Sequence, residues 1–192
     1  FIVSFVQNEP YIHNMETISH NYMDEIISSV SYLGDALSPA FIFLAIPYHM
    51  IKLITAIDNK LNKNRAEYKN FKIVRVTDKY PQANELILAS SILKTKINPS
   101  KILQNHKCLI LDASTMFHLY EALKFKKPQI DCHLTVSGYG ITKPANVKAR
   151  IGTYISDIVE QCGGFCGNVN SVIVDGLMSG YSQFTLDVPI IK

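Results

Sequence analysis

The sequence lacks closely spaced cysteines. Its four cysteines, at positions 108, 132, 162 and 166, form no CxxC pair. Cys162 and Cys166 flank a Gly-Gly-Phe turn that could bring two thiols together, but no second pair or nearby histidine completes a metal set. We therefore predict free thiols and no metal site in this stretch of chain, and free thiols indicate a reducing compartment.

The sequence also lacks the marks of several large function classes. Its serines stand in no nucleophile elbow and it has no GxxxxGKS phosphate loop, so neither a hydrolase nor a kinase is predicted. The net charge is only +3, and the lysines fall in scattered groups without aromatic residues between them. We expect solvated helix faces there and no nucleic-acid partner.

No apolar run in the sequence is long and pure enough to cross a membrane. The most apolar window, residues 36–57, is interrupted by Pro39, Pro47 and Lys52, which favours a strand followed by a helix. No secretory signal is visible. The chain starts at Phe1 inside an apolar run, so we interpret it as a piece of a longer chain.

Strand patterns alternate with helical patterns over the first two thirds of the chain. The expected strands are residues 1–6, 41–46, 71–76 and 108–111, and the expected helices are residues 15–37, a segment from Pro47, residues 83–93 and residues 116–125. This alternation predicts an α/β fold, in which helices flank a mostly parallel sheet of the Rossmann-like kind. Asp112 is expected to cap the helix that follows it, and Pro47 to be a first helical residue.

The last third of the chain predicts a small β-grasp domain. Strands are expected at 134–138, 147–151 and 171–174, with a helix from Thr153 to Cys162 that Thr153 caps and Gly163-Gly164 ends. The loop 175–180 holds two glycines that allow a tight turn beside a neighbour. We predict a domain of residues 1–128 and a second of residues 129–192, joined by a hinge at 126–128.

A series of motifs follows residue 130: Val136-Ser137-Gly138, Lys143-Pro144, Ile151-Gly152-Thr153, Cys162-Gly163-Gly164-Phe165, Gly176-Leu177-Met178-Ser179-Gly180 and the ending Leu186-Asp187-Val188-Pro189. These motifs resemble the soluble-ligand-binding β-grasp (SLBB) domain of one known family, the C subunit of the Rnf-type electron transport complex. That family is a relative of the flavin-bearing subunit of respiratory complex I. Earlier in the chain, Glu9-Pro10-Tyr11, Lys79-Tyr80-Pro81-Gln82 and Asp112-Ala113-Ser114-Thr115 resemble its α/β domain more thinly.

The resemblance implies a role in electron transport. In the family the α/β domain holds FMN, accepts a hydride from NADH and passes electrons to 4Fe-4S clusters. It also implies other complex subunits as partners and a place in the cytoplasm, peripheral on the inner membrane. The glycine-rich FMN phosphate loop and the cysteine runs for the clusters are not in this sequence. We therefore expect no bound cofactor and no turnover in this stretch alone.

The resemblance implies two cofactor-binding residues, Glu9 and Glu85. Each could hydrogen-bond a flavin or the nicotinamide ribose, and each could equally cap a helix or pair with a lysine. Phe5 stands where the family has a glycine, so its ring is expected where backbone would meet the flavin. Two alternatives to the redox function stay open at this point: a cofactor-free binding or scaffold module, and a β-grasp part that binds a small soluble ligand.

Overall fold

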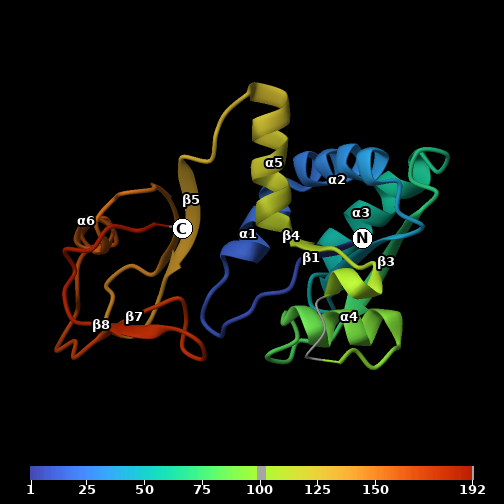
Figure 1. The fold of residues 1–192 in the computed structure, drawn as a ribbon. Coiled ribbons are helices and arrows are strands. Elements are labelled where there is room, and N and C mark those ends of the chain that lie inside the picture. The colour runs from blue at the N-terminus through green and yellow to red at the C-terminus, as the bar shows by residue number, and fades with distance from the viewer. Residues whose placement is uncertain (99–102, 192) are drawn as a thin grey trace.

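A four-stranded parallel sheet forms the centre of the α/β part of the molecule (Figure 1). The computed structural model describes residues 1–98 and 103–191. The strands lie in the order β3-β2-β1-β4; they are β1 (Ile2–Ser4), β2 (Ile42–Pro47), β3 (Phe71–Val76) and β4 (Ile110–Asp112). All three pairings are parallel, which confirms the α/β fold class expected from the sequence.

Helices cover both faces of this sheet. The helices of the α/β part are α1 (Asn14–Asn21), α2 (Met23–Leu37), α3 (Ile51–Lys63), α4 (Glu85–Leu93), α5 (Ala113–Phe125) and the short 3-10 helix η1 (Leu103–His106). Val3 and Leu44 pack with residues of α2, α3 and α5 in one buried cluster. Ile2 and Ala45 pack with residues of α4 in another. Because neighbouring strand residues point to opposite faces, short uninterrupted apolar strands fill both layers.

Two details of the sequence expectation are wrong in this part. The helix expected over residues 15–37 is broken at Tyr22, which leaves helical geometry at φ −126° and ψ 31°. The Tyr22 ring stacks on Phe117 of α5 at 4.1 Å between centroids, a tertiary contact that periodicity does not reveal. Pro47 is the last residue of β2 and not the first of a helix, because α3 begins only at Ile51.

Side-chain caps fix the start of two helices. Asp112 caps α5 as the sequence predicts, since its Oδ1 accepts a hydrogen bond from Thr115 N at 2.6 Å. Asn84 caps α4 in the same way, accepting from Leu86 N at 3.1 Å. This second cap was not predicted from the sequence. Each one satisfies an amide that the helix itself leaves unpaired.

The β-grasp part contains two small antiparallel sheets and one helix. Its elements are β5 (Asp131–Val136), β6 (Ala145–Arg150), α6 (Ile155–Gln161), β7 (Val172–Val174) and β8 (Tyr181–Gln183). β5 pairs with β6 and β7 with β8. Ile141, Val159 and Cys162 form its buried centre. The expected order of strands and helix is confirmed, although the strands do not join into one sheet among the described residues.

The ends of α6 agree with the sequence in one respect and not in another. Gly163 and Gly164 end it with φ values of 82° and 74°, as expected for residues in the left-handed region. Thr153 does not cap the helix. The N-cap position belongs to Tyr154, whose side chain makes no cap hydrogen bond, while Thr153 O accepts from Ile190 N at 2.9 Å. The C-terminal segment thus runs along the start of α6.

Ion pairs stabilise the segment that connects the α/β part to the β-grasp part. Lys126 ends α5 in the left-handed region at φ 55°. Lys127 Nζ then donates to Glu121 Oε1 at 2.8 Å and to Asp131 Oδ2 at 3.0 Å. One cation thus joins α5 to β5 across the predicted hinge; the domain boundary at residue 128 itself stays a prediction.

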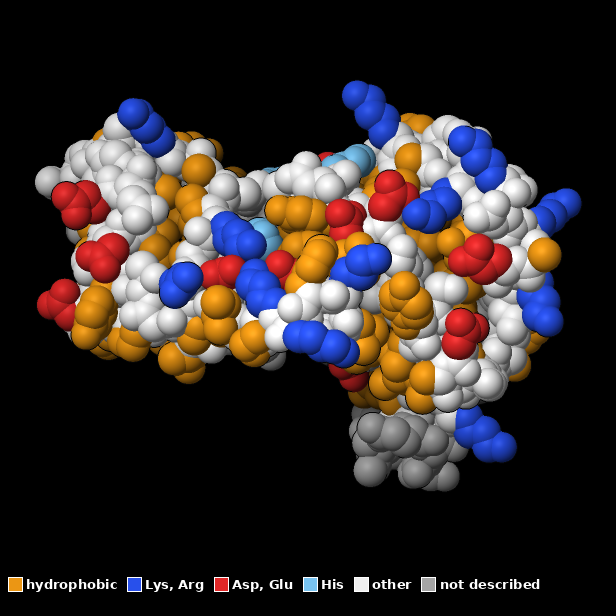
Figure 2. Space-filling model, turned by 90° about the horizontal axis from the view of Figure 1, so that it is seen from above, with side chains coloured by type: hydrophobic (Ala, Val, Ile, Leu, Met, Phe, Trp, Pro, Cys, Tyr) orange, Lys and Arg blue, Asp and Glu red, His pale blue; other side chains and the backbone are white. Residues whose placement is uncertain are grey.

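Bulk features of the structure agree with the composition. Cys108, Cys132 and Cys162 are buried and Cys166 is exposed, and all of them are free thiols. Lysine and arginine side chains are distributed over both parts on the face drawn in Figure 2, with acidic side chains between them. No helix in the described ranges is long and apolar enough to span a membrane.

Candidate functional site

The carboxyl edge of the parallel sheet is the candidate site. Because the strands are parallel, the segments that follow them emerge at the same edge. These segments are residues 5–13 after β1, 48–50 after β2, 77–84 after β3, and the start of α5 after β4. Ligands of open α/β sheets bind where such loops converge.

Two histidines and two carboxylates link three of these segments. His49 Nδ1 lies 2.7 Å from Asp78 Oδ1, so the loop after β2 is hydrogen-bonded to the loop after β3. His49 Nε2 lies 3.9 Å from Glu16 Oε2 on α1, and the same oxygen lies 3.6 Å from His13 Nδ1. No motif in the sequence indicates this cluster, because the fold brings residues far apart in the chain to one edge.

Glu85 lies at this edge of the molecule on α4. It is the first residue of that helix, directly after the cap Asn84, and it is exposed. A carboxylate in the first helical turn is stabilised by the positive N-terminal end of the helix dipole. Its assignment to a cofactor stays a prediction.

Glu9 lies in a different environment from Glu85. It is 5% exposed, and its carboxylate faces the loop between β7 and β8 of the β-grasp part. Met178 N donates to Oε2 at 2.7 Å, and Ser179 N donates to Oε1 at 3.1 Å. Ser179 Oγ donates to Oε1 as well. Three of roughly four acceptor positions of this carboxylate are therefore used within the chain.

The hydrogen bonds to Glu9 change its acidity. They stabilise the ionised carboxylate, so the bond from the Ser179 hydroxyl, followed by those from the Met178 and Ser179 amides, holds the pKa of Glu9 below its usual value against the opposing effect of burial. Glu9 is thus an ionised, buried group.

Phe5 does not stand in the place that the sequence predicts for its ring. It is 1% exposed and packs in the cluster formed with α2, α3 and α5. The side chain is therefore a core residue. It does not project from the sheet edge.

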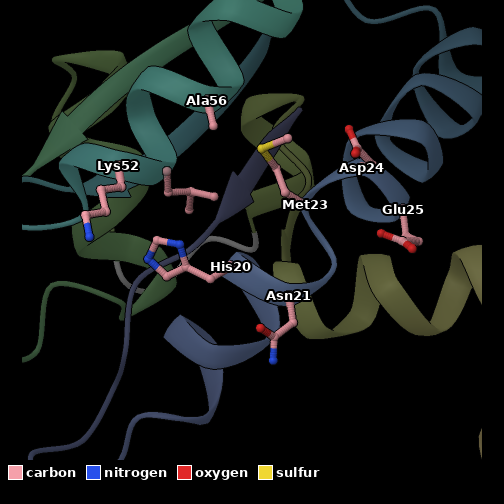
Figure 3. A pocket seen from close by; sticks show the side chains of 8 residues that line it. His20, Asn21, Met23, Asp24, Glu25, Lys52 and Ala56 are labelled. Carbon is pink, nitrogen blue, oxygen red and sulfur yellow. The ribbon is translucent and has the colours of Figure 1, made fainter.

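A surface cavity of about 400 Å³ lies between the α1–α2 junction and α3. His20 and Lys52 line one side of it, and Asp24 and Glu25 lie on the other (Figure 3). Lys60 Nζ binds Asp24 Oδ1 at 2.5 Å. The cavity wall holds one lysine and two carboxylates, so it suits a ligand with groups of both signs better than a simple anion.

A partly buried aromatic cluster joins Tyr22, between α1 and α2, and helix α5 to strand β5. Phe117 packs edge-on against His133 at 5.7 Å between ring centroids, and His118 lies 6.0 Å from His133. Burial lowers the pKa of His118 and of His133. Lys148 acts in the same direction on both, whereas Glu121 opposes it. Both imidazoles are thus held neutral between the two parts.

These two histidines predict a loss of stability in mild acid. Because the pKa of each histidine is lower in the folded chain than the unfolded value of 6.5, the unfolded chain binds more protons than the folded chain when the pH falls below that value. The free energy of unfolding should therefore fall as the pH drops below about 6.5, and stay flat with respect to these groups above it. Chemical denaturation at several pH values between about 5 and 7.5 measures this slope.

The control for this prediction uses variants with neutral amides. Changing both His118→Gln and His133→Gln should flatten the slope, while His20→Gln, at an exposed position, should leave it unchanged. An equal slope in the double variant would show that other groups cause the acid sensitivity.

Metal binding finds no support in this geometry. No group of three or more His, Cys, Asp or Glu side chains within residues 1–98 and 103–191 is arranged to hold a metal ion. The His49–Asp78 pair offers a hydrogen bond between two loops of this edge.

Comparison with known proteins identifies the family. The family model described as the Nuo51 FMN-binding domain matches residues 1–121. The chain belongs to the Nuo51 FMN-binding domain family. A second model, the SLBB domain, matches residues 134–181, and both agree with the resemblance found in the sequence.

Curated relatives of this family member match it over both of its parts. It is 28% identical over 191 residues to the C subunit of the "Ion-translocating oxidoreductase complex" of Rhodobacter capsulatus, covering 100% of this chain and 36% of that protein. It is 27% identical over 192 residues to the C subunit of the "Proton-translocating ferredoxin:NAD(+) oxidoreductase complex" of Clostridium ljungdahlii, covering 100% of this chain and 41% of that protein. The chain thus spans less than half the length of these relatives, and it is similar to such C subunits over its whole extent.

Solved structures share the fold. A chain of the NAD+-reducing [NiFe]-hydrogenase in the air-oxidized state superposes with a TM-score of 0.81 at 15% identity, over 100% of this chain and 37% of that one. The same enzyme in the H2-reduced state gives a TM-score of 0.74 at 16% identity, over 91% and 34%. At this identity the likeness establishes the architecture.

The described residues fit one portion of an FMN molecule better than another. Carboxylates of Asp78 and Glu85 at the edge can accept hydrogen bonds from sugar hydroxyls. They repel a phosphate, and the sequence holds no glycine-rich loop whose amides would seat that anion. The edge therefore suits the hydroxyl portion of a flavin or nicotinamide nucleotide, and the phosphate needs other residues.

Proposed function

We propose that this chain is the flavin-domain and SLBB portion of an electron transport subunit, the C subunit of an ion-translocating oxidoreductase complex. In this role NADH would reduce FMN at the carboxyl edge of the sheet, and electrons would continue to 4Fe-4S clusters bound elsewhere in the same subunit. The match of the FMN-binding family model across residues 1–121 carries the proposal.

The proposed role also implies partners and a cellular location. The partners would be the other subunits of the complex, and the protein would be cytoplasmic, peripheral on the inner membrane. The similarity to C subunits of such complexes supports the assignment of the partners.

Within the site, Glu85 is our candidate for binding the cofactor. Bound FMN would supply the ability to accept two electrons and release them singly. The exposed Glu85 carboxylate would accept a hydrogen bond from a flavin or ribose hydroxyl and so orient the ring above the strand ends. Glu9 can add at most one further acceptor position through Oε2, because its other positions are used.

The test is a titration with FMN, in which the quenching of flavin fluorescence measures binding. The natural full-length protein should bind FMN, whereas these 192 residues alone should not, because the phosphate seat is missing. Glu85→Gln should weaken binding by about tenfold, the effect of losing one hydrogen bond to a charged group. Glu67→Gln is the matched control, since Glu67 is exposed and lies before β3, at the opposite edge.

A full-length protein that binds no flavin in this titration would contradict the proposal. That result would favour the cofactor-free binding module, in which the fold persists without redox chemistry. Binding that is unchanged in Glu85→Gln would contradict only the role of Glu85.

A further inference from the structure

The loop between β7 and β8 is built around a carboxylate. The amides of Met178 and Ser179 and the Ser179 hydroxyl all donate to the two oxygens of Glu9. These donors come from neighbouring residues of one loop, and the acceptor comes from a residue 169 positions earlier in the chain. Converging backbone amides of this kind form a concave anion site.

The backbone of this loop adopts a shape that leaves room for the carboxylate. Gly176 has φ +101°, and a methyl group on it would lie 2.5 Å from Glu9 Cδ and closer still to Cγ. Asp175 beside it is in the left-handed region at φ 68°. Only glycine allows Glu9 to approach the backbone this closely.

The segment that carries Glu9 is held against the β-grasp part at further points. Ser137 Oγ donates to Tyr11 O at 2.8 Å, and His13 N donates to Thr135 Oγ1 at 2.9 Å. Tyr11 itself is in the left-handed region at φ 63°, an uncommon conformation for a bulky side chain. In Figure 1 this segment runs from the end of β1 toward β7 before it turns back into α1.

We propose that the loop Asp175–Gly180 is a carboxylate-binding site of the β-grasp part, and that Glu9 is its tethered ligand. By filling this site, Glu9 holds the segment 5–13 against the β-grasp part. This segment begins at the candidate cofactor edge, directly after β1. The ligand class of the site is a carboxylate presented on an extended chain. This inference rests on the contacts alone and does not depend on flavin binding.

The charge and burial of Glu9 explain why its carboxylate needs the hydrogen-bond donors of this loop. An ionised carboxylate that is 5% exposed needs hydrogen bonds to offset its lost hydration. The three donors of the loop supply them, and hydrogen bonds to charged acceptors are stronger than those between neutral groups. Without Glu9 the two amides of the loop would be left without this acceptor, so a free carboxylate should occupy the site.

The experiment removes the tethered ligand and supplies a free one. In Glu9→Ala, the amide NMR resonances of Met178 and Ser179 should shift, and sodium acetate should restore them saturably in the millimolar range. Sodium chloride at equal ionic strength should not. The parent chain should not respond to acetate, because Glu9 occupies the site. Unshifted amides in Glu9→Ala, or equal responses to acetate and chloride, would overturn the proposal.

A second measurement tests the positioning role. In Glu9→Gln, which keeps the shape of the side chain but not its charge, hydrogen exchange at the amides of His13 and Ser179 should speed up by at least tenfold. Exchange in β2 should be unchanged. Glu25→Gln is the matched control, since Glu25 lies on α2 and away from the β7–β8 loop. Unchanged exchange at His13 would show that Glu9 does not position this segment.

Discussion

Replacing Phe117 by alanine is expected to lower the free energy of unfolding by about 3–5 kcal/mol. Phe117 is 4% exposed and belongs to the larger core cluster. Its ring stacks on Tyr22 at 4.1 Å and meets His133 of β5 edge-on. The substitution therefore removes buried area, leaves a cavity, and takes away the ring that joins the two parts.

The same helix provides the control for this change. Phe125 lies at the last position of α5 and is 64% exposed. Its ring meets Tyr120 edge-on, at 6.0 Å between centroids, so Phe125→Ala should cost about 1 kcal/mol or less. Chemical denaturation of the two variants gives the difference, and a cost for Phe117→Ala below about 1 kcal/mol would mean that the cluster is not packed as described.

Replacing Gly176 by alanine is expected to cost about 3 kcal/mol of stability. The alanine would have to adopt φ +101°, which is unfavourable by roughly 1–2 kcal/mol for any residue with a Cβ. Its methyl group would also displace the Glu9 carboxylate from the donors of the loop. Leaving a buried charged acceptor and its donors unpaired adds roughly 1–3 kcal/mol.

Gly138 separates these two causes. Its φ is +117°, close to that of Gly176, but a methyl group there would have no heavy atom within 4 Å. Gly138→Ala should therefore show the conformational cost alone, about 1–2 kcal/mol. In a Glu9→Ala background, Gly176→Ala should cost no more than Gly138→Ala, as a double-mutant cycle would measure. Equal costs of the two glycine changes in the parent chain would contradict the Glu9 contact.

Local signals in the sequence were sufficient for the architecture. Apolar runs such as Phe41–Ile46 predicted buried strands within one or two residues, because a strand covered on both faces must be apolar throughout. Asp112 revealed a helix start, because a cap acts on amides only three residues away. The motifs after residue 130 were enough to indicate the β-grasp part and its family.

The predictions that proved wrong concern features that depend on a residue far away in the chain. The pattern of residues 15–37 runs through Tyr22 without a break, and the break is explained by Phe117, which lies far along the chain. Pro47 is compatible with both a strand end and a helix start, and the pairing of β2 with β3 decided between them. The ring of Phe5 was placed at the edge because one residue gives no indication of which face it points to.

The candidate site, too, has features that the sequence predicted and features that only the fold revealed. Sequence could name Glu9 and Glu85 as retained carboxylates, but it gave no reason to treat them differently. The fold places Glu85 exposed on a helix at the sheet edge and buries Glu9 against Met178 and Ser179. It also brings His49 to Asp78, a pair that no motif announced.

The sequence by itself determined the order of strands and helices and the kinship with an FMN-binding domain family, because these depend on periodicity, caps and motifs that act over a few residues. Only the tertiary structure decided what Glu9 binds, where the histidines meet and how α1 and α5 contact the β-grasp part. Those features arise from contacts between segments far apart in the chain, such as that of Glu9 with Ser179 at a separation of 170. Such pairs leave no pattern in a single sequence, since each partner alone is compatible with many neighbours.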